Sequence, residues 1–274
     1  MGLNMANNII FLGTAGDSIT YGKQFRASGG IVIKTDSNQL HIDPGPGALV
    51  RAMQTKINIR ETTGVLVSNH SIIRSNDLNA LISGMTYSGL DHKGVVVAHK
   101  NVIEGNEEIK PIIRNKCFDY VEKAITLEIG RKVGINDAEI LATKSFGSNS
   151  MGFKITTTDF ILGYTSDTEF RVELAEEFEN VNILIVNCKN PEGIKEKGSM
   201  NTNDIIKLLE KIKPELTVIT GFGIKMIEHD PINEARKIQK ATGCQVMAAK
   251  DGLIINPTSY SAKNKQSRLK SFIQ

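Results

Sequence analysis

Short apolar segments rich in β-branched residues dominate the first half of the chain. Each is bounded by Gly, Pro, Ser or Asn, as strands commonly are. The predicted strands cover residues 8–13, 30–35, 40–43, 64–68 and 95–100. The stretch 101–143 has no clear period and is expected to hold further strands, including EILAT. Residues 151–156 and 159–165 predict a hairpin, because only a tight turn separates them.

Strands and amphipathic helices alternate in the second half. Residues 182–188, 216–223 and 245–255 predict strands, the last of these two strands around Asp251-Gly252. One helix is predicted over 201–214, where an apolar stripe ends at Pro214. A second covers 229–243, with Asp230 as its cap and Pro231 at its first position. The pattern, without repeats or a linker, predicts one αβ domain over residues 1–274.

An earlier segment, VLVSNHSIIRSNDLNALI (65–82), predicts a strand, a polar turn and a helix. Ser75 or Asn76 is the expected helix cap, and apolar residues then recur at helical spacing. Many enzymes hold a metal or a phosphate at such a turn. Here the turn offers only His70 and Arg74, and no acid precedes Asp77.

Composition narrows the functional classes. The 274 residues are 40% hydrophobic and 23% charged, as in an ordinary globular protein. The net charge of +3 gives no clear nucleic-acid signal, and no apolar run is long enough for a membrane span. Much of the basic excess lies in a tail, residues 261–274, which is expected to be solvated or to make a weak anionic contact.

The three cysteines are odd in number, widely spaced and without a CxxC pair. They predict buried free thiols in a reducing compartment and no cysteine zinc site. The N-terminus lacks the features of a signal peptide. The sequence therefore predicts a cytoplasmic protein.

Several motifs occur in a characteristic order: FLGTAGD, LHIDPGPGALVRA, the segment 65–85, GYTSDTEF, KGSMNTNDIIKLL, LTVITGFG and AKDG. From about residue 8 to residue 255 the chain resembles the metallo-β-lactamase superfamily, particularly its microbial metal-dependent hydrolases. The resemblance implies an α+β fold, a four-layer αββα sandwich. It also implies a site at one edge of the sandwich, where the family binds zinc or other divalent metals.

The ligand positions of that family are mostly occupied here by residues that bind metals poorly. The motif Thr-His-x-His-x-Asp-His falls on residues 68–74, and the other ligand motifs fall further along the chain. The positions implied are Asn69, Ser71, Ile73, Arg74, Ser145, Asp167, Ser199 and Gly221. Only Asp167 keeps a ligand type, because hydroxyls and amides replace imidazole poorly, Ile73 has no lone pair and Arg74 is a cation. We expect no metal and no other cofactor.

Arg74 is expected to take over the neutralisation of Asp167, through a direct contact or one water. Asn69, Ser71 and Ser145 would complete a polar lining. Asp43 is expected to brace the Pro-Gly turn that follows it. The remaining histidines, His92, His99 and His229, lie in segments that form no spacing motif, and His70 is expected to bond to the backbone.

The predicted function is that of a pseudoenzyme, a non-catalytic protein that acts in binding or scaffolding. Its partner would be a second copy of itself or an active relative. Two alternatives remain at this point. One is a hydrolase of the superfamily with an atypical site. The other is a sensor of a small anion, with Arg26 and His70 as possible ligand contacts in the cleft.

Overall fold

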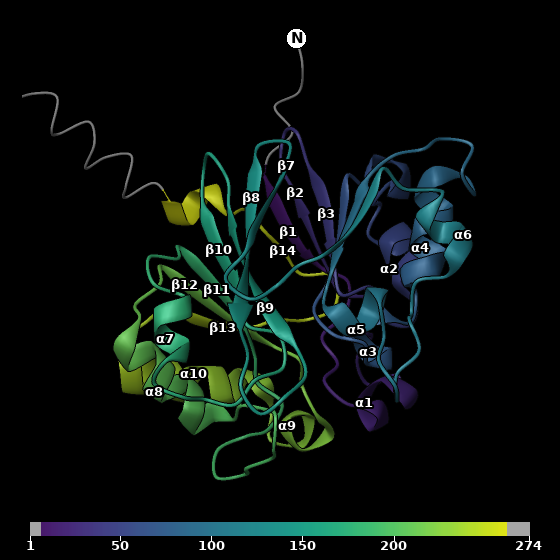
Figure 1. The fold of residues 1–274 in the computed structure, drawn as a ribbon. Helices are drawn as coiled ribbons and strands as arrows, with labels where there is room; N and C mark the ends of the chain where they lie inside the picture. The colour runs from purple at the N-terminus through teal and green to yellow at the C-terminus, as the bar shows by residue number, and fades with distance from the viewer. Residues whose placement is uncertain (1–6, 262–274) are drawn as a thin grey trace, which may run out of the picture.

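The computed structural model describes residues 7–261, which form two mixed β-sheets packed face to face between helices (Figure 1). The predicted αββα sandwich is confirmed. The first sheet has the order β14-β1-β2-β3-β4-β5-β6. Its strands are β1 (Asn8–Phe11), β2 (Ile31–Lys34), β3 (Gln39–Ile42), β4 (Gly64–Val67), β5 (Val95–Ala98), β6 (Lys123–Thr126) and β14 (Ile254–Ile255).

The second sheet has the order β13-β12-β11-β10-β9-β8-β7. Its strands are β7 (Lys132–Ile135), β8 (Ala138–Lys144), β9 (Met151–Thr156), β10 (Ile161–Tyr164), β11 (Ile183–Asn187), β12 (Leu216–Thr220) and β13 (Val246–Ala248). β9 and β10 are antiparallel neighbours, as the predicted hairpin requires, and the ambiguous stretch 101–143 contributes β6, β7 and most of β8.

Helices cover the outer face of each sheet (Figure 1). The first sheet is covered by α2 (Ala48–Gln54), the 3₁₀ helix η1 (Ile59–Glu61), α4 (Leu78–Thr86), α5 (Lys100–Ile103) and α6 (Asn115–Phe118). The second is covered by α7 (Leu174–Glu177), α8 (Thr202–Lys211) and α10 (Pro231–Thr242). Three short helices, α1 (Ser18–Gly22), α3 (Ile72–Ser75) and α9 (Ile224–Glu228), lie toward the lower edge of the sandwich in Figure 1.

Strand alternation explains the layers. In β2, Ile31 and Ile33 belong to the core between the sheets, whereas Val32 packs with the outer cluster under α2. Successive side chains of a strand point to opposite faces, so a strand covered on both sides is apolar throughout. The sandwich is therefore held by one core between the sheets and separate cores beneath the helices.

Strand direction determines where the loops gather. β3, β4, β5 and β6 are parallel neighbours, and so are β10, β11, β12 and β13. Parallel neighbours end at the same edge of a sheet, and ligand sites of α/β sheets lie beyond carboxyl ends. The segments that follow β3, β4, β10, β11 and β12 meet at one edge of the sandwich, where they bond to one another.

Some local predictions need correction. Helix α4 begins at Leu78, after Asp77, because residues 72–75 form a separate helical turn with Ser71 before it. The Asp77 carboxylate accepts the backbone N–H groups of Gly47 and Ala48, so it caps α2. For α10, the cap at Asp230 and Pro231 at the first position are confirmed.

All three cysteines are free and buried, as predicted. Within residues 7–261, no helix is both long and apolar enough to cross a membrane. The predicted basic tail, apart from its first residue, lies outside the described residues, so its role stays a prediction.

Folding stability should depend on pH through His41, a residue of β3 that is 1% exposed. Its Nε2 lies 2.8 Å from the Gly29 carbonyl oxygen, and its Nδ1 has no partner within residues 7–261. Burial lowers the pKa of His41 from 6.5 to about 4. The folded state thus favours the neutral ring, and this stabilisation is complete above pH 6.5 and lost as the pH falls toward 4.

A shift from 6.5 to about 4 corresponds to ~3 kcal/mol of unfolding free energy. His41→Gln keeps an N–H donor for Gly29 but has no titrating ring. We expect the unfolding free energy of this variant, measured with urea between pH 7.5 and 4.5, to fall less steeply than that of the wild type. Equal slopes would show that His41 is not responsible.

Candidate functional site

Four N–H groups converge on the carboxylate of Asp167, in the turn after β10. Arg74 donates from Nη2 to Oδ1 at 2.7 Å and from Nε to Oδ2 at 3.2 Å. The amide of Asn187 donates to Oδ1 at 2.9 Å, and that of Asn69 donates to Oδ2 at 3.2 Å. A carboxylate has about four lone-pair sites, so these donors occupy its full hydrogen-bonding capacity.

The predicted contact between Arg74 and Asp167 is thus confirmed, as a bidentate ion pair. The Arg74 side chain is only 8% exposed and that of Asp167 is 32% exposed. Burial alone would raise the pKa of Asp167, but the charge of Arg74 and the three side chains that donate to it leave that pKa below its usual value. The same pairing holds the pKa of Arg74 above its ordinary range despite burial. Both groups are therefore charged at neutral pH.

A second carboxylate, Asp43, lies behind this pair. Its Oδ1 accepts the backbone N–H of Ser68 at 2.7 Å, and its Oδ2 accepts the hydroxyls of Ser68 at 2.8 Å and Tyr164 at 2.6 Å. Arg74 Nε lies 3.9 Å from Oδ2. Burial raises the pKa of Asp43, against the opposing effect of Arg74 and these hydrogen bonds. The Asp43 carboxylate therefore ties β3, β4 and β10 together, whereas the next turn is bonded by the Asp43 backbone carbonyl, which accepts the N–H of Gly45.

The backbone at this edge adopts conformations that most residues avoid. Asp43 has φ +53°, Ser166 has φ +54° and Gly221 has φ +67°. Left-handed backbone is uncommon outside glycine, although Asp tolerates it better than most residues. At Gly221 an added Cβ would lie 2.9 Å from side-chain atoms of Asn187. Two of these left-handed residues, Asp43 and Ser166, lie in the turns that carry the carboxylates of Asp43 and Asp167.

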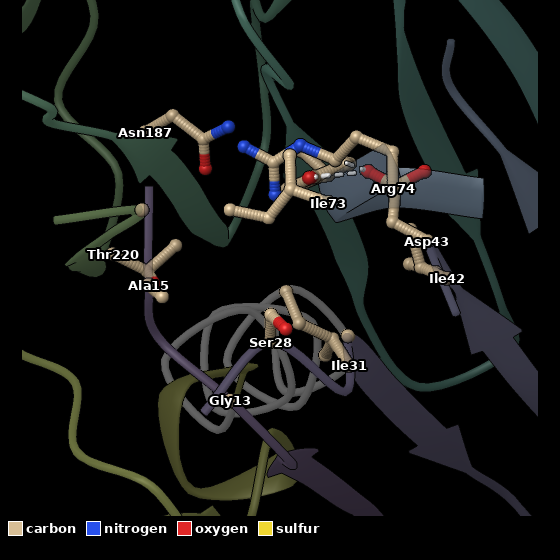
Figure 2. Close-up of a pocket in the computed structure, with 13 residues that line it drawn as sticks. Gly13, Ala15, Ser28, Ile31, Ile42, Asp43, Ile73, Arg74, Asn187 and Thr220 are labelled. Carbon is tan, nitrogen blue, oxygen red and sulfur yellow. Dashed lines mark hydrogen bonds and ion pairs between the residues drawn. The ribbon is translucent and has the colours of Figure 1, made fainter. Parts of the chain in front are cut away.

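The space next to Arg74 is small. The pocket measures about 10 Å³, roughly what one water molecule requires. Figure 2 shows the Asn187 amide and the Arg74 guanidinium facing each other, with Ile73 beside the arginine. Asn187 Oδ1 is buried without a hydrogen-bond partner within residues 7–261. The side chains of Ile73, Arg74 and Asn187 therefore fill most of the cleft.

The sequence and the fold of this chain are similar to those of known proteins. No protein-family model matches the sequence. The uncharacterized protein MJ1374 of Methanocaldococcus jannaschii is 33% identical over 253 residues, which cover 91% of this chain and 94% of that protein. The solved structure of the metallo-β-lactamase fold protein YhfI from Bacillus subtilis has a TM-score of 0.75 at 15% identity, covering 91% of this chain and 98% of YhfI.

This chain belongs to the family of MJ1374 and has the metallo-β-lactamase fold. The structure of Zn²⁺-bound PqqB from Methylobacterium extorquens is similar as well. Its TM-score is 0.70 at 13% identity, and the match covers 90% of this chain and 99% of PqqB. At such identities the likeness to the solved structures concerns the fold and leaves the chemistry of the site to this chain's own residues.

Most ligand positions implied by the metallo-β-lactamase resemblance lie at this edge, but not all of them join the cluster. Asn69, Arg74 and Asp167 are in direct contact, and Ser71 joins through the Asn69 amide oxygen. Ile73 and Gly221 line the small pocket. Ser145 Oγ is buried and has no hydrogen-bond partner among residues 7–261. Ser199 lies in a separate surface depression, beside Glu169 and Glu196.

The two residues predicted as possible anion contacts are not part of the pocket lining, which includes neither Arg26 nor His70. The backbone hydrogen bond expected for His70 is absent at its buried Nδ1 within the described chain. His70 instead lies close to His99. Burial lowers the pKa of His99, and the nearby His70 lowers it further. His70 follows β4 and His99 follows β5, and these two strands are parallel neighbours. The spacing of the histidines along the sequence did not reveal that they lie close together.

A divalent metal does not fit the residues of this site. Within residues 7–261 no group of three or more His, Cys, Asp and Glu side chains is placed to hold a metal ion. Asp167 has its lone pairs directed at N–H donors, and Asn69 and Asn187 present their amide nitrogens, which have no lone pair for a metal. The described side chains at this edge therefore do not form the ligand set that a divalent metal would need.

Two important residues escaped the sequence reasoning. Asn187 ends the buried strand β11 and was not singled out, although a polar residue at the carboxyl end of an apolar strand is a usable signal. Tyr164 ends β10 and was not singled out either. Its hydroxyl reaches Asp43 across 121 positions of sequence, so no local pattern connects the two.

The Arg74–Asp167 pair predicts a coupled effect on stability. Arg74→Met and Asp167→Asn should each lower the unfolding free energy by about 1 to 4 kcal/mol. This range extends below the values for fully buried pairs because Asp167 is 32% exposed. The double variant should lose less than the sum of the two single losses, since neither charge then stays unpaired. Urea unfolding at pH 7 gives all four values.

Arg131→Met is the control for loss of an arginine, because Arg131 is exposed and has no ion pair within the described chain. Its effect should stay within about 0.5 kcal/mol. Strict additivity of Arg74→Met and Asp167→Asn would mean that the ion pair contributes no coupling energy.

Proposed function

We propose that this metallo-β-lactamase-fold protein is a pseudoenzyme that acts by binding and not by hydrolysis. The observation that carries the proposal is the saturation of Asp167 by four N–H donors, two of them from Arg74. In the family this carboxylate bridges metal ions. Here an internal guanidinium meets the same electrostatic need from within the chain.

Arg74 also opposes a metal directly. At ~5 Å and an effective dielectric of 20, each unit of metal charge would meet about 3 kcal/mol of repulsion from the guanidinium. Arginine stays protonated at any physiological pH, and burial does not release the proton here because the pairing with Asp167 raises its pKa. A divalent ion would have to displace the arginine and break its bonds to Asp167.

A metal-free hydrolase is not favoured either. Ser68 donates its hydroxyl to the carboxylate of Asp43, as a nucleophile with an adjacent base would, but it is completely buried. The adjacent pocket has room for about one water and none for an ester or phosphate substrate. A nucleophile needs both a base and access to the substrate, and Ser68 has only the first.

The same limits apply to an anion sensor in this cleft. An anion would compete with Asp167 for Arg74, in a space that holds one water. Binding of a protein partner is the better supported mode. Ile19, Phe25 and Ile72 are 48%, 51% and 61% exposed. Ile19 lies in α1, Phe25 follows that helix and Ile72 begins α3, and both helices lie toward the same edge of the sandwich (Figure 1). Exposed apolar side chains near one edge favour contact with another chain, a second copy or an active relative.

The free, buried thiols favour a reducing compartment, so a cytoplasmic location is part of the proposal. Light scattering after size exclusion tests self-association. A concentration-dependent dimer that Ile72→Asp dissociates would support pairing with a second copy. A monomer at all concentrations would leave an active relative as the proposed partner.

Metal content tests the central claim. We expect the purified protein to contain less than about 0.1 equivalent of zinc, iron or manganese, because the donors around Asp167 are N–H groups. Added zinc should not raise the melting temperature, since a ligand stabilises only a state that binds it. About one equivalent of metal that survives a chelator and is lost in Asp167→Ala would refute the proposal.

Catalytic activity provides a second test. We expect phosphodiester, β-lactam and thioester substrates to show no turnover above background, with or without added zinc or manganese. The comparison includes Asp167→Ala and the surface variant Arg131→Met. An activity that Asp167→Ala abolishes and Arg131→Met leaves unchanged would establish the protein as an enzyme.

A further inference from the structure

A larger pocket lies in the helix layer outside the first sheet, between α2, η1 and α4. Its volume is about 550 Å³, within the range of small-molecule sites. It shares no lining residue with the pocket beside Arg74. The lining is mainly apolar: Leu49, Met53, Ile57, Ile59 and Tyr87, with Gly84 and the polar Lys56, Asn58 and Arg60.

Gly84 lines this pocket from helix α4. It lies inside helix α4, where glycine costs about 1 kcal/mol relative to alanine. Its backbone is not left-handed, and an added Cβ would meet only Ile59 at 3.6 Å and Leu49 at 3.7 Å, which are ordinary contacts. Neither the backbone nor close packing requires glycine here. The missing side chain instead leaves space between the apolar groups of η1 and α2.

The rim of the pocket exposes large apolar side chains. Met53 is 77% exposed and Tyr87 is 57% exposed. Both border the pocket and are available to cover an apolar ligand. Methionine is well suited to this, because its flexible thioether adapts to different shapes.

The charge of the pocket has one sign. Lys56 and Arg60 contribute to its lining, and no acidic residue does. Arg60 is already engaged, since its guanidinium lies 3.8 Å from the Tyr87 ring centroid and pairs with Asp91. Lys56 is exposed and has no ion pair in the described part of the chain. The nearby acid Glu61 is paired with Lys34 instead. Lys56 is therefore the cation available to a ligand.

We propose that this pocket binds a small amphipathic anion, namely a monocarboxylate with an apolar chain or ring. The apolar part would lie on Leu49, Ile59 and Gly84, beneath Met53 and Tyr87. The carboxylate would pair with Lys56 at the rim. The inference does not depend on the proposed function of the Arg74 cleft, because no residue is common to the two pockets.

Octanoate is the probe, and the methyl resonances of the 13C-methyl-labelled methionines report binding in the intact protein. Met53 is assigned with Met53→Leu. We expect octanoate to shift the Met53 signal saturably, the neutral octanamide to bind more weakly, and octylammonium to cause no shift. Equal binding of octanoate and octanamide would overturn the role of Lys56, and no shift with octanoate would overturn the site.

Two variants locate the ligand. Gly84→Leu should fill the pocket and abolish the octanoate shift while its melting temperature is unchanged or higher, since a helix former replaces glycine. Lys56→Gln should weaken octanoate binding roughly two- to fivefold, as for an exposed ion pair. Lys225→Gln, the same change at an exposed lysine of α9, is the control and should bind like the wild type.

Octanoate binding that persists in Gly84→Leu would place the ligand elsewhere and overturn the proposal. A Met53 signal that shifts on dilution without ligand would also overturn it, because the pocket would then be an interface between copies of the chain. In Lys56→Gln, octanamide should still bind, and octanoate should no longer bind more tightly than octanamide. This result would support a site with an apolar part for the ligand chain and a charged rim for its carboxylate.

Discussion

The ion pair between Arg74 and Asp167 is the interaction on which the loop edge of this protein depends. Arg74 follows β4 of the first sheet and Asp167 follows β10 of the second, so one bidentate contact joins the two sheets. The turns at this edge are polar and cannot be held by apolar packing. A mostly buried carboxylate must be neutralised, and the guanidinium does this with directed N–H bonds.

A metal ion and an arginine satisfy the same carboxylate in different ways. A metal keeps positions open for water and lowers its pKa, which is the basis of metal-assisted hydrolysis. An arginine offers only N–H donors in a fixed plane, and here those donors leave Asp167 no free lone pair. Ile73 and Arg74 also occupy the space, down to the volume of one water. Asp43 and Ser166, in the turns of this edge, have left-handed backbone conformations.

The outer helix layer presents the opposite situation. The cleft at the sheet edge is filled and electrostatically balanced. The pocket between α2, η1 and α4 is mainly apolar and is bordered by Lys56, which has no ion pair within residues 7–261. Gly84 leaves space beside the apolar groups of this pocket, although glycine lowers the helix propensity of α4.

The sequence by itself predicted one αβ domain, most of its strands and the two long helices, and its resemblance to the metallo-β-lactamase superfamily implied the four layers and the Arg74–Asp167 contact. Strand alternation, helix caps and the order of motifs are local signals, and the motif register placed both charged residues at one centre. The tertiary structure alone decided the contributions of Asn187, Tyr164 and Asp43, the proximity of His70 and His99, and the pocket at Gly84. These are single polar residues at strand ends, or a gap between helices. Only the pairing of parallel strands and the packing of side chains bring them together, and neither is encoded in residue spacing.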